Sequence, residues 1–102
     1  MGNGESSEAT QLALAEAALE KNEWTRAREL MHQLACAVPM NKHYRAQLGY
    51  ARAGELMAAG QHTRAREELE RVIRIAPDHA LALAMLGRAR RPSSRLLALF
   101  RR

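Results

Sequence analysis

One segment of this chain occurs twice, and that repetition constrains the fold more than any other feature. Residues 19–39 and 57–77 align over their whole length. The pentapeptide Thr-Arg-Ala-Arg-Glu at 25–29 returns unchanged at 63–67, thirty-eight positions later. Self-similarity at such a period is typical of stacked repeats, in which each supersecondary unit packs on the next. We therefore expect a small repeat array, a class of fold that usually offers a surface to a partner.

Apolar residues within each copy recur at three- and four-residue spacing, which predicts helices. Turn residues, Asn22 and Gly60, interrupt the pattern, and we expect Gly60 to adopt the left-handed conformation. Prolines then close the segments, because a helix ends at or before the residue that precedes a proline. Ser7 is the expected cap of the first helix. The predicted helices span residues 8–21, 25–37, 42–59, 63–75 and 79–91, with a last short helix within 93–102.

The composition agrees with an all-α fold. Hydrophobic residues make up 47% of the chain but aromatic residues only 4%, and alanine supplies much of the apolar content. Alanine-rich sequences favour closely packed helices over sheets. We predict a helix-turn-helix repeat solenoid of about two and a half repeats. Residues 1–7 are expected to be disordered, 8–92 to form the repeat domain, and 93–102 to form a basic amphipathic capping helix.

The helical pairs resemble tetratricopeptide repeats, a family with a 34-residue helix-turn-helix unit. When each closing proline is set on the family's late proline, the turn residues and the small residues of the second helix coincide with the family pattern. The resemblance implies close helix crossings at Ala27, Ala65 and Gly87, and packed rings at Trp24 and His62. The second repeat departs from the pattern, since four extra residues precede it and Gly49 stands at a position where the family has a large side chain.

The resemblance also implies a ligand groove lined by the first helix of each repeat. The corresponding positions are Leu12, Ala13, Glu16, Tyr50, Ala51, Gly54, Leu81, Ala84, Met85 and Arg88. Apart from Arg88, these lack the basic and amide side chains with which some relatives hold a terminal carboxylate. The groove therefore suits an apolar helix or an extended peptide of another protein. We interpret the chain as an adaptor or chaperone-like subunit, similar in repeat type to the small bacterial chaperones of type III secretion.

The positive charge is concentrated at the end of the chain. Residues 1–78 contain ten basic and eleven acidic side chains, and every charged residue beyond Asp78 is an arginine. This basic tail comprises Arg88, Arg90, Arg91, Arg95, Arg101 and Arg102. It could bind an anionic surface or nucleic acid. However, it lacks the interleaved aromatic residues that stack on bases, and it could simply be a solvated face at a helix end. Self-association through exposed end helices is the other alternative.

No catalytic or cofactor motif is present, so we expect neither an enzyme nor a bound cofactor. His32 and Cys36 have a spacing that could bring two metal ligands together, but they lack the third and fourth ligands of a site, so no metal is predicted. No apolar run approaches the length of a membrane span. A single cysteine and the absence of a secretory signal favour the cytoplasm.

Overall fold

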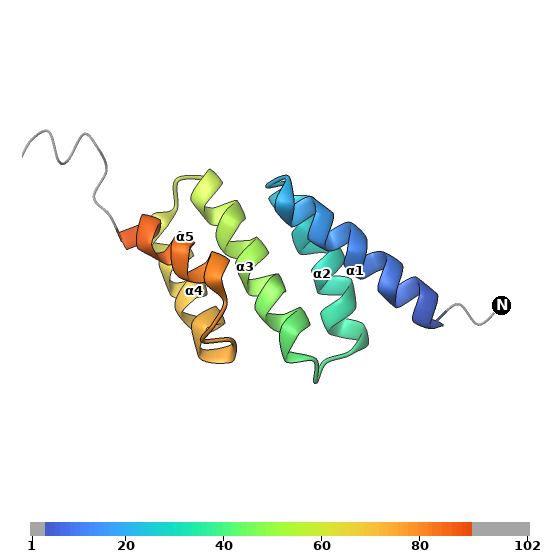
Figure 1. The fold of residues 1–102 in the computed structure, drawn as a ribbon. Coiled ribbons are helices and arrows are strands. Elements are labelled where there is room, and N and C mark those ends of the chain that lie inside the picture. The colour runs from blue at the N-terminus through green and yellow to red at the C-terminus, as the bar shows by residue number, and fades with distance from the viewer. Residues whose placement is uncertain (1–3, 91–102) are drawn as a thin grey trace, which may run out of the picture.

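The computed structural model describes residues 4–90, which form five helices. The helices are α1 (Gly4–Glu20), α2 (Trp24–Ala37), α3 (Lys42–Ala58), α4 (His62–Ile75) and α5 (Ala80–Arg90). They form two helical hairpins, α1–α2 and α3–α4, followed by α5 as the start of a third (Figure 1). Within the described residues there is no strand, so the predicted all-α helical-repeat fold is confirmed.

The turns inside the two hairpins are built alike. Asn22 has φ 59° and Gly60 has φ 77°, so both residues are left-handed, as expected for the residue that ends a helix. The amide of the following residue donates back into the helix in each case, from Glu23 to the Ala18 carbonyl at 2.9 Å and from Gln61 to the Leu56 carbonyl at 2.8 Å. Asparagine tolerates the left-handed region better than most non-glycine residues, which explains how one repeat uses Asn where the other uses Gly.

The amino-terminal boundary was predicted wrongly. Helix α1 begins at Gly4, so Gly4–Ser7 are helical rather than disordered, and Ser7 lies inside the helix rather than capping it. Glutamates in the first turns favour this longer helix, because negative charge is stabilising near a helix amino terminus. Residues 1–3 and 91–102 lie outside the described residues. The disorder predicted for 1–3 and the capping helix predicted for 93–102 therefore stay predictions.

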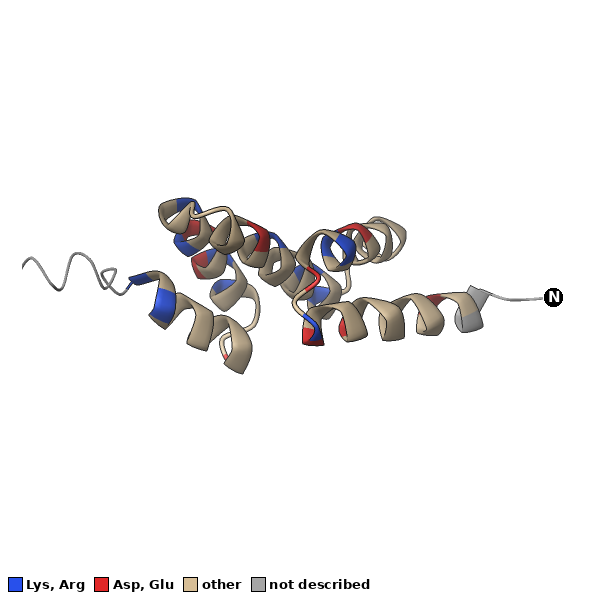
Figure 2. Cartoon of the chain, turned by 90° about the horizontal axis from the view of Figure 1, so that it is seen from above, with Lys and Arg blue, Asp and Glu red and all other residues tan. Residues whose placement is uncertain are grey.

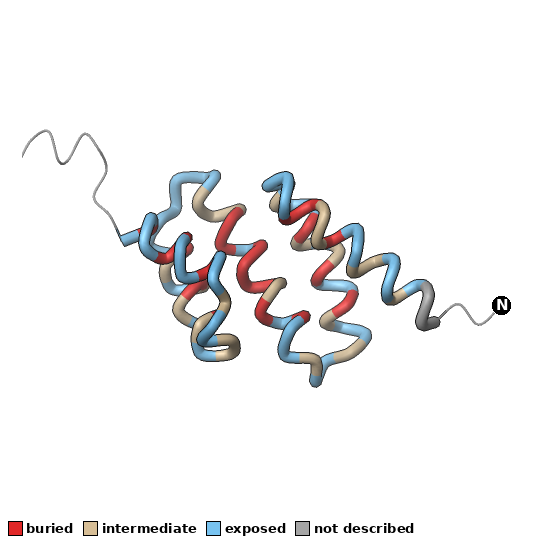
Figure 3. The backbone as a smooth tube through the Cα atoms, viewed as in Figure 1, coloured by how far each residue is buried: buried red, intermediate tan, exposed pale blue. Residues whose placement is uncertain are grey.

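The buried residues lie at equivalent positions in the two copies of the repeated segment. Met31, Leu34, Leu69 and Val72 are the largest fully buried side chains, and they form two equivalent pairs, Met31 with Leu69 and Leu34 with Val72. Buried positions run along the inner faces of the helices (Figure 3). Ala27 and Ala65 are also fully buried, which agrees with the predicted close crossings at these two positions. Each repeat thus contributes equivalent large residues to the core, Met31 and Leu34 to one buried cluster and Leu69 and Val72 to another.

Helix α3 is buried on two sides, and its glycines explain how. A Cβ atom placed on Gly49 would lie 2.6 Å from Cγ2 of Val72 in α4. A Cβ atom placed on Gly54 would overlap the indole ring of Trp24 in α2. The same indole meets the Tyr50 ring edge-on, with 5.5 Å between the ring centroids. Gly49, which stands where the family has a large side chain, therefore leaves room for the Val72 side chain of α4.

Two expectations about packing were wrong. His62 is exposed, although it aligns with Trp24 and was expected to pack in the core. Gly87 was expected at a close crossing, but no described atom lies within 4 Å of a Cβ built on it. The two residues differ in their surroundings. His62 lies at the exposed start of α4, where a polar imidazole replaces the indole of Trp24. Gly87 lies in the last described helix, and the residues that would form the second helix of its repeat fall outside the described residues.

Candidate functional site

The surface between α1, α3 and α5 is hollowed into three clefts. The largest, of about 410 Å³, lies between the amino-terminal half of α3 and the turn that leads into α5. A second, of about 220 Å³, is lined by α1, α3 and α5 together, and a third, of about 320 Å³, lies between α1 and α3. Gln47 and Leu81 line both of the first two clefts. We refer to the three together as the concave hollow.

Apolar and polar side chains both line the concave hollow. The apolar contribution includes Leu12, Ala46 and Leu81, and the Leu81 side chain is 58% exposed. Such exposure for a leucine at the mouth of two clefts leaves apolar area available for contact. The remaining lining residues are Glu8, Ala9, Glu16, Leu19, Glu20, Lys42, His43, Tyr44, Gln47, Ala76, Asp78, His79 and Ala80.

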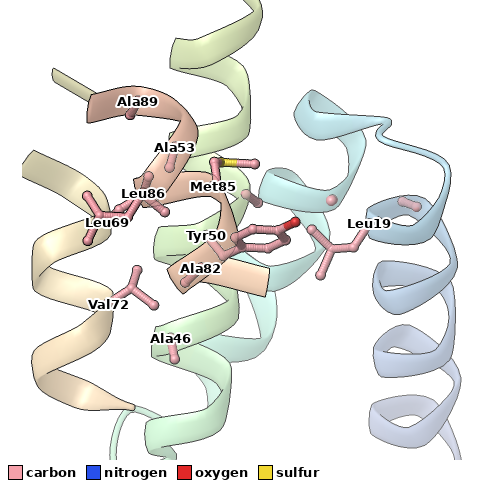
Figure 4. Close-up of a cluster of buried hydrophobic side chains, with 13 residues drawn as sticks. Leu19, Ala46, Tyr50, Ala53, Leu69, Val72, Ala82, Met85, Leu86 and Ala89 are labelled. Carbon is pink, nitrogen blue, oxygen red and sulfur yellow. The ribbon is translucent and has the colours of Figure 1, made fainter. Parts of the chain in front are cut away.

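A cluster of buried side chains around Tyr50 lies next to the hollow. Leu19 from α1 and Met85 from α5 belong to the same buried cluster as Tyr50, and Figure 4 shows Met85 above the ring and Leu19 beside it. Burial raises the pKa of the Tyr50 hydroxyl, and the nearby Arg88 acts in the opposite direction. The middle of α3 is therefore covered, and the open surface lies along its amino-terminal half.

Only part of the predicted groove lies at this surface. Leu12, Glu16 and Leu81 line the clefts. Ala13, Ala84 and Arg88 are exposed but line none of the three clefts.

The other predicted groove residues, Tyr50, Ala51, Gly54 and Met85, are buried in the core and offer no free surface, so these assignments need correction. Tyr50 is covered by Leu19 and Met85, and Gly54 is covered by Trp24, which shifts the open part of α3 toward its start.

The sequence prediction missed His43, Ala46 and Gln47, which line the clefts from α3. Their spacing to Tyr50 is that of one helix face, so extending the predicted face toward the start of α3 would have found them. The turn residues Ala76 and Asp78 and the α5 residue Ala80 were missed too. They line the largest cleft because the chain turns back after Pro77. The helical pattern of the sequence does not predict where this turn lies relative to α3.

His79 links the hollow to the start of α5. Its Nδ1 accepts a hydrogen bond from the Ala82 amide at 3.0 Å, so the side chain caps the helix. Its Nε2 lies 2.7 Å from the Gln47 side-chain oxygen, which makes Nε2 the protonated nitrogen of a neutral ring. The ring also packs on Tyr50, with 5.1 Å between centroids. Burial lowers the pKa of His79, and the nearby His43 adds to this effect.

Two polar contacts tie α1 to α3 across the hollow. The Tyr44 hydroxyl donates to Glu8, and this hydrogen bond raises the pKa of Tyr44. The imidazole Nε2 of His43 lies 3.4 Å from a carboxylate oxygen of Glu16, with both side chains about half exposed. The Tyr44–Glu8 hydrogen bond is partly buried, whereas the Glu16–His43 pair is exposed, and an exposed pair of this kind contributes little to stability.

The described residues among the other candidates line none of the three clefts. Arg90 pairs with Glu70 at 3.1 Å, and Arg88 is exposed. The remaining arginines of the basic tail, Arg91, Arg95, Arg101 and Arg102, fall outside the described residues. Sγ of Cys36 lies 3.5 Å from Nε2 of His32. Between residues 4 and 90 no group of three metal-ligating side chains comes together.

Stacked helical hairpins whose first helices share a hollow define a helical-repeat fold. Residues 44–89 match the sequence model of the tetratricopeptide repeat, which covers nearly all of α3, α4 and α5. This part of the chain is a tetratricopeptide repeat. As a family, these repeats mediate protein–protein interactions rather than catalysis. No curated protein and no solved structure matches the chain significantly. Among residues 4–90 no helix has the length and apolar character that crossing a membrane requires.

Proposed function

We propose that this protein binds an amphipathic helix of another protein in the concave hollow. The observation that carries the proposal is the exposure of Leu81, a large apolar side chain at the junction of two clefts formed by three helices. A partner's apolar face would bury Leu81 together with Leu12. Burial of a leucine side chain contributes roughly 1.5–3 kcal/mol, so a few such contacts suffice for moderate affinity.

A helical partner fits this surface better than an extended one. An extended peptide gains affinity by pairing its backbone with a free sheet edge. The backbone groups of α1, α3 and α5 already pair within their own helices, so the hollow provides few backbone partners. A helix satisfies its own backbone hydrogen bonds and needs only side-chain contacts. The partner should therefore place apolar residues at i, i+3, i+4 and i+7.

The role that follows is that of an adaptor or a chaperone-like subunit in the cytoplasm. Such a protein shields the apolar face of a partner helix or joins it to another component. The small size of the hollow supports a single short segment as the ligand rather than a whole domain. The first repeat, although outside the family match, supplies one wall of the surface through Leu12 and Glu16.

A photo-crosslinking amino acid at position 81 tests the proposal. Leu83 lies on the same helix, is 46% exposed and lines none of the three clefts, so position 83 is a matched control. In cells of the source organism, we expect a defined crosslinked protein from position 81 and little from position 83. Equal crosslinking from the two positions would contradict binding in the hollow.

Self-association is the alternative, and the two end helices favour it. Leu14 on α1 and Leu83 on α5 are 43% and 46% exposed on surfaces that no other described helix covers. In an array, an end helix needs a cap or a neighbour to remain soluble. Light scattering of the pure protein separates the two ideas, because a monomer over a wide concentration range argues against self-association.

A further inference from the structure

The wall of the concave hollow that α1 forms carries only negative charge. Glu8 lines the cleft beside Leu12, and Glu16 and Glu20 line the cleft beside Leu81. Helix α1 contains no lysine or arginine along its whole length, although the chain as a whole has a net charge of +5. Figure 2 shows acidic positions along α1 and basic positions at the far end of α5. The hollow is therefore an acidic surface on a basic protein.

These carboxylates lack cationic partners of their own. Glu8 is bound by the neutral hydroxyl of Tyr44, and the closest partner of Glu16 is the exposed imidazole of His43. Glu20 forms no hydrogen bond or ion pair with the described residues. Elsewhere in the molecule the arrangement differs. Glutamates of α3 and α4 bind arginines at 2.6–3.1 Å, in the pairs Glu55–Arg28, Glu68–Arg71 and Glu70–Arg90.

The other charges facing the hollow do not cancel this wall. Lys42 and Asp78 both line the largest cleft, and their charges offset each other. Arg88 lies toward the other end of α5 and lines none of the clefts. The three clefts thus expose four carboxylates and one lysine around a mostly apolar lining. A partner whose charges matched this surface would have a basic face next to its apolar face.

We infer that the partner segment is a basic amphipathic helix, whose leucine-like side chains cover Leu81 and Leu12 while its lysines or arginines pair with Glu8, Glu16 and Glu20. This inference rests on the proposed function and adds the charge of the ligand. The same wall repels anionic lipid and nucleic acid, so neither would bind in the hollow. Exposed ion pairs steer a partner and select its charge more than they add affinity.

Three synthetic peptides test the inference against the full-length protein. Each is a helix with leucine at the i, i+3, i+4 and i+7 positions, and the remaining positions are all lysine, all glutamine or all glutamate. Affinity is measured by fluorescence anisotropy of the labelled peptide. At low salt we expect the lysine peptide to bind about eight-fold tighter than the glutamine peptide, a factor of roughly two for each of three exposed pairs. At about 0.5 M salt this preference should nearly vanish.

Paired variants identify the carboxylates responsible. The double variant Glu16→Gln, Glu20→Gln should lose most of the preference for lysine. The control Glu29→Gln, Glu67→Gln removes the same charge from exposed positions on α2 and α4 and should keep the preference. Because all four side chains are solvent-accessible, neither double variant should unfold the protein, and a thermal melt of each one checks this.

The outcomes separate the two proposals. If the three peptides bind equally and Leu81→Gln weakens all of them, the hollow binds helices but the charge inference is overturned. If none of the peptides binds, the proposed function itself fails. If the protein without peptide is a dimer that Glu16→Gln, Glu20→Gln dissociates, the occupant is the basic tail of a second copy, and the inference of a foreign partner is overturned.

Discussion

Replacing Gly54 with alanine should destabilise the protein, although the same change in most helices is stabilising. Gly54 lies inside α3, where alanine would ordinarily be favoured by about 1 kcal/mol. Here the new Cβ atom would overlap three atoms of the Trp24 indole ring. The ring cannot move away freely, because its edge packs on Tyr50 with 5.5 Å between centroids.

The expected magnitude follows from these two opposing effects. Inserting a methyl group into a packed core costs about 1–3 kcal/mol, and a rigid indole places this site at the upper end. After subtracting the helix-propensity gain, we expect a loss of about 2 kcal/mol. For a domain of this size that corresponds to a fall in melting temperature of roughly 10 °C. In a small protein such a loss is a large fraction of the total stability.

Gly87→Ala is the matched control. Gly87 also lies in a helix, but it is exposed and no described atom lies within 4 Å of its Cβ position. This variant should be stabilised by about 0.5–1 kcal/mol. Thermal unfolding followed by circular dichroism measures both proteins. Equal stabilisation of the two variants would show that Trp24 does not pack against α3, and the arrangement of the first two hairpins would have to be revised.

Other changes test other parts of the fold. Ala27→Leu should overpack the fully buried crossing of the first repeat and cost about 1–3 kcal/mol in a denaturant titration. Gly60→Ala forces an alanine to φ 77° and should cost about 1 kcal/mol. Burial lowers the pKa of His79, so the unfolded chain takes up a proton first as the pH falls below about 6.5. Stability should then decrease from that pH down to the lowered pKa of His79. The variant His79→Asn keeps an oxygen that can cap α5 but cannot take up this proton. Urea titrations of this variant should therefore lack this part of the pH dependence. Deleting residues 93–102 should lower the melting temperature and raise the mass measured by light scattering if this segment caps α5, where Leu83 is 46% exposed.

Local chemistry made much of the fold predictable from the sequence. The left-handed Gly60 and the helix ends before Pro39 and Pro77 follow from the backbone preferences of single residues, and the structure shows all of them. The equivalence of Met31 with Leu69 follows from the repeat itself, because equivalent residues meet the same neighbours. Where a residue's own conformation or the repeat decides the structure, sequence patterns are sufficient.

The site was predicted less well because tertiary packing decides it. Tyr50 and Gly54 share a helix face with His43 and Gln47, so the pattern alone makes all four candidates for an open groove. Contacts from other helices, Leu19 and Met85 on Tyr50 and Trp24 on Gly54, close one half of that face. His62 shows the same limit, since it aligns with a packed tryptophan but is exposed.

The central claim is that the concave hollow is the protein-binding surface, and amide chemical shifts measured by NMR test it directly. The full-length protein is titrated with the leucine–lysine peptide, and the shift of each amide is followed. The largest changes should map to residues 8–20, 42–47 and 79–81, which line the clefts. Helices α2 and α4, on the opposite side, should change little. If the largest shifts instead appear on α2 and α4, the peptide binds elsewhere and the account of this surface is wrong.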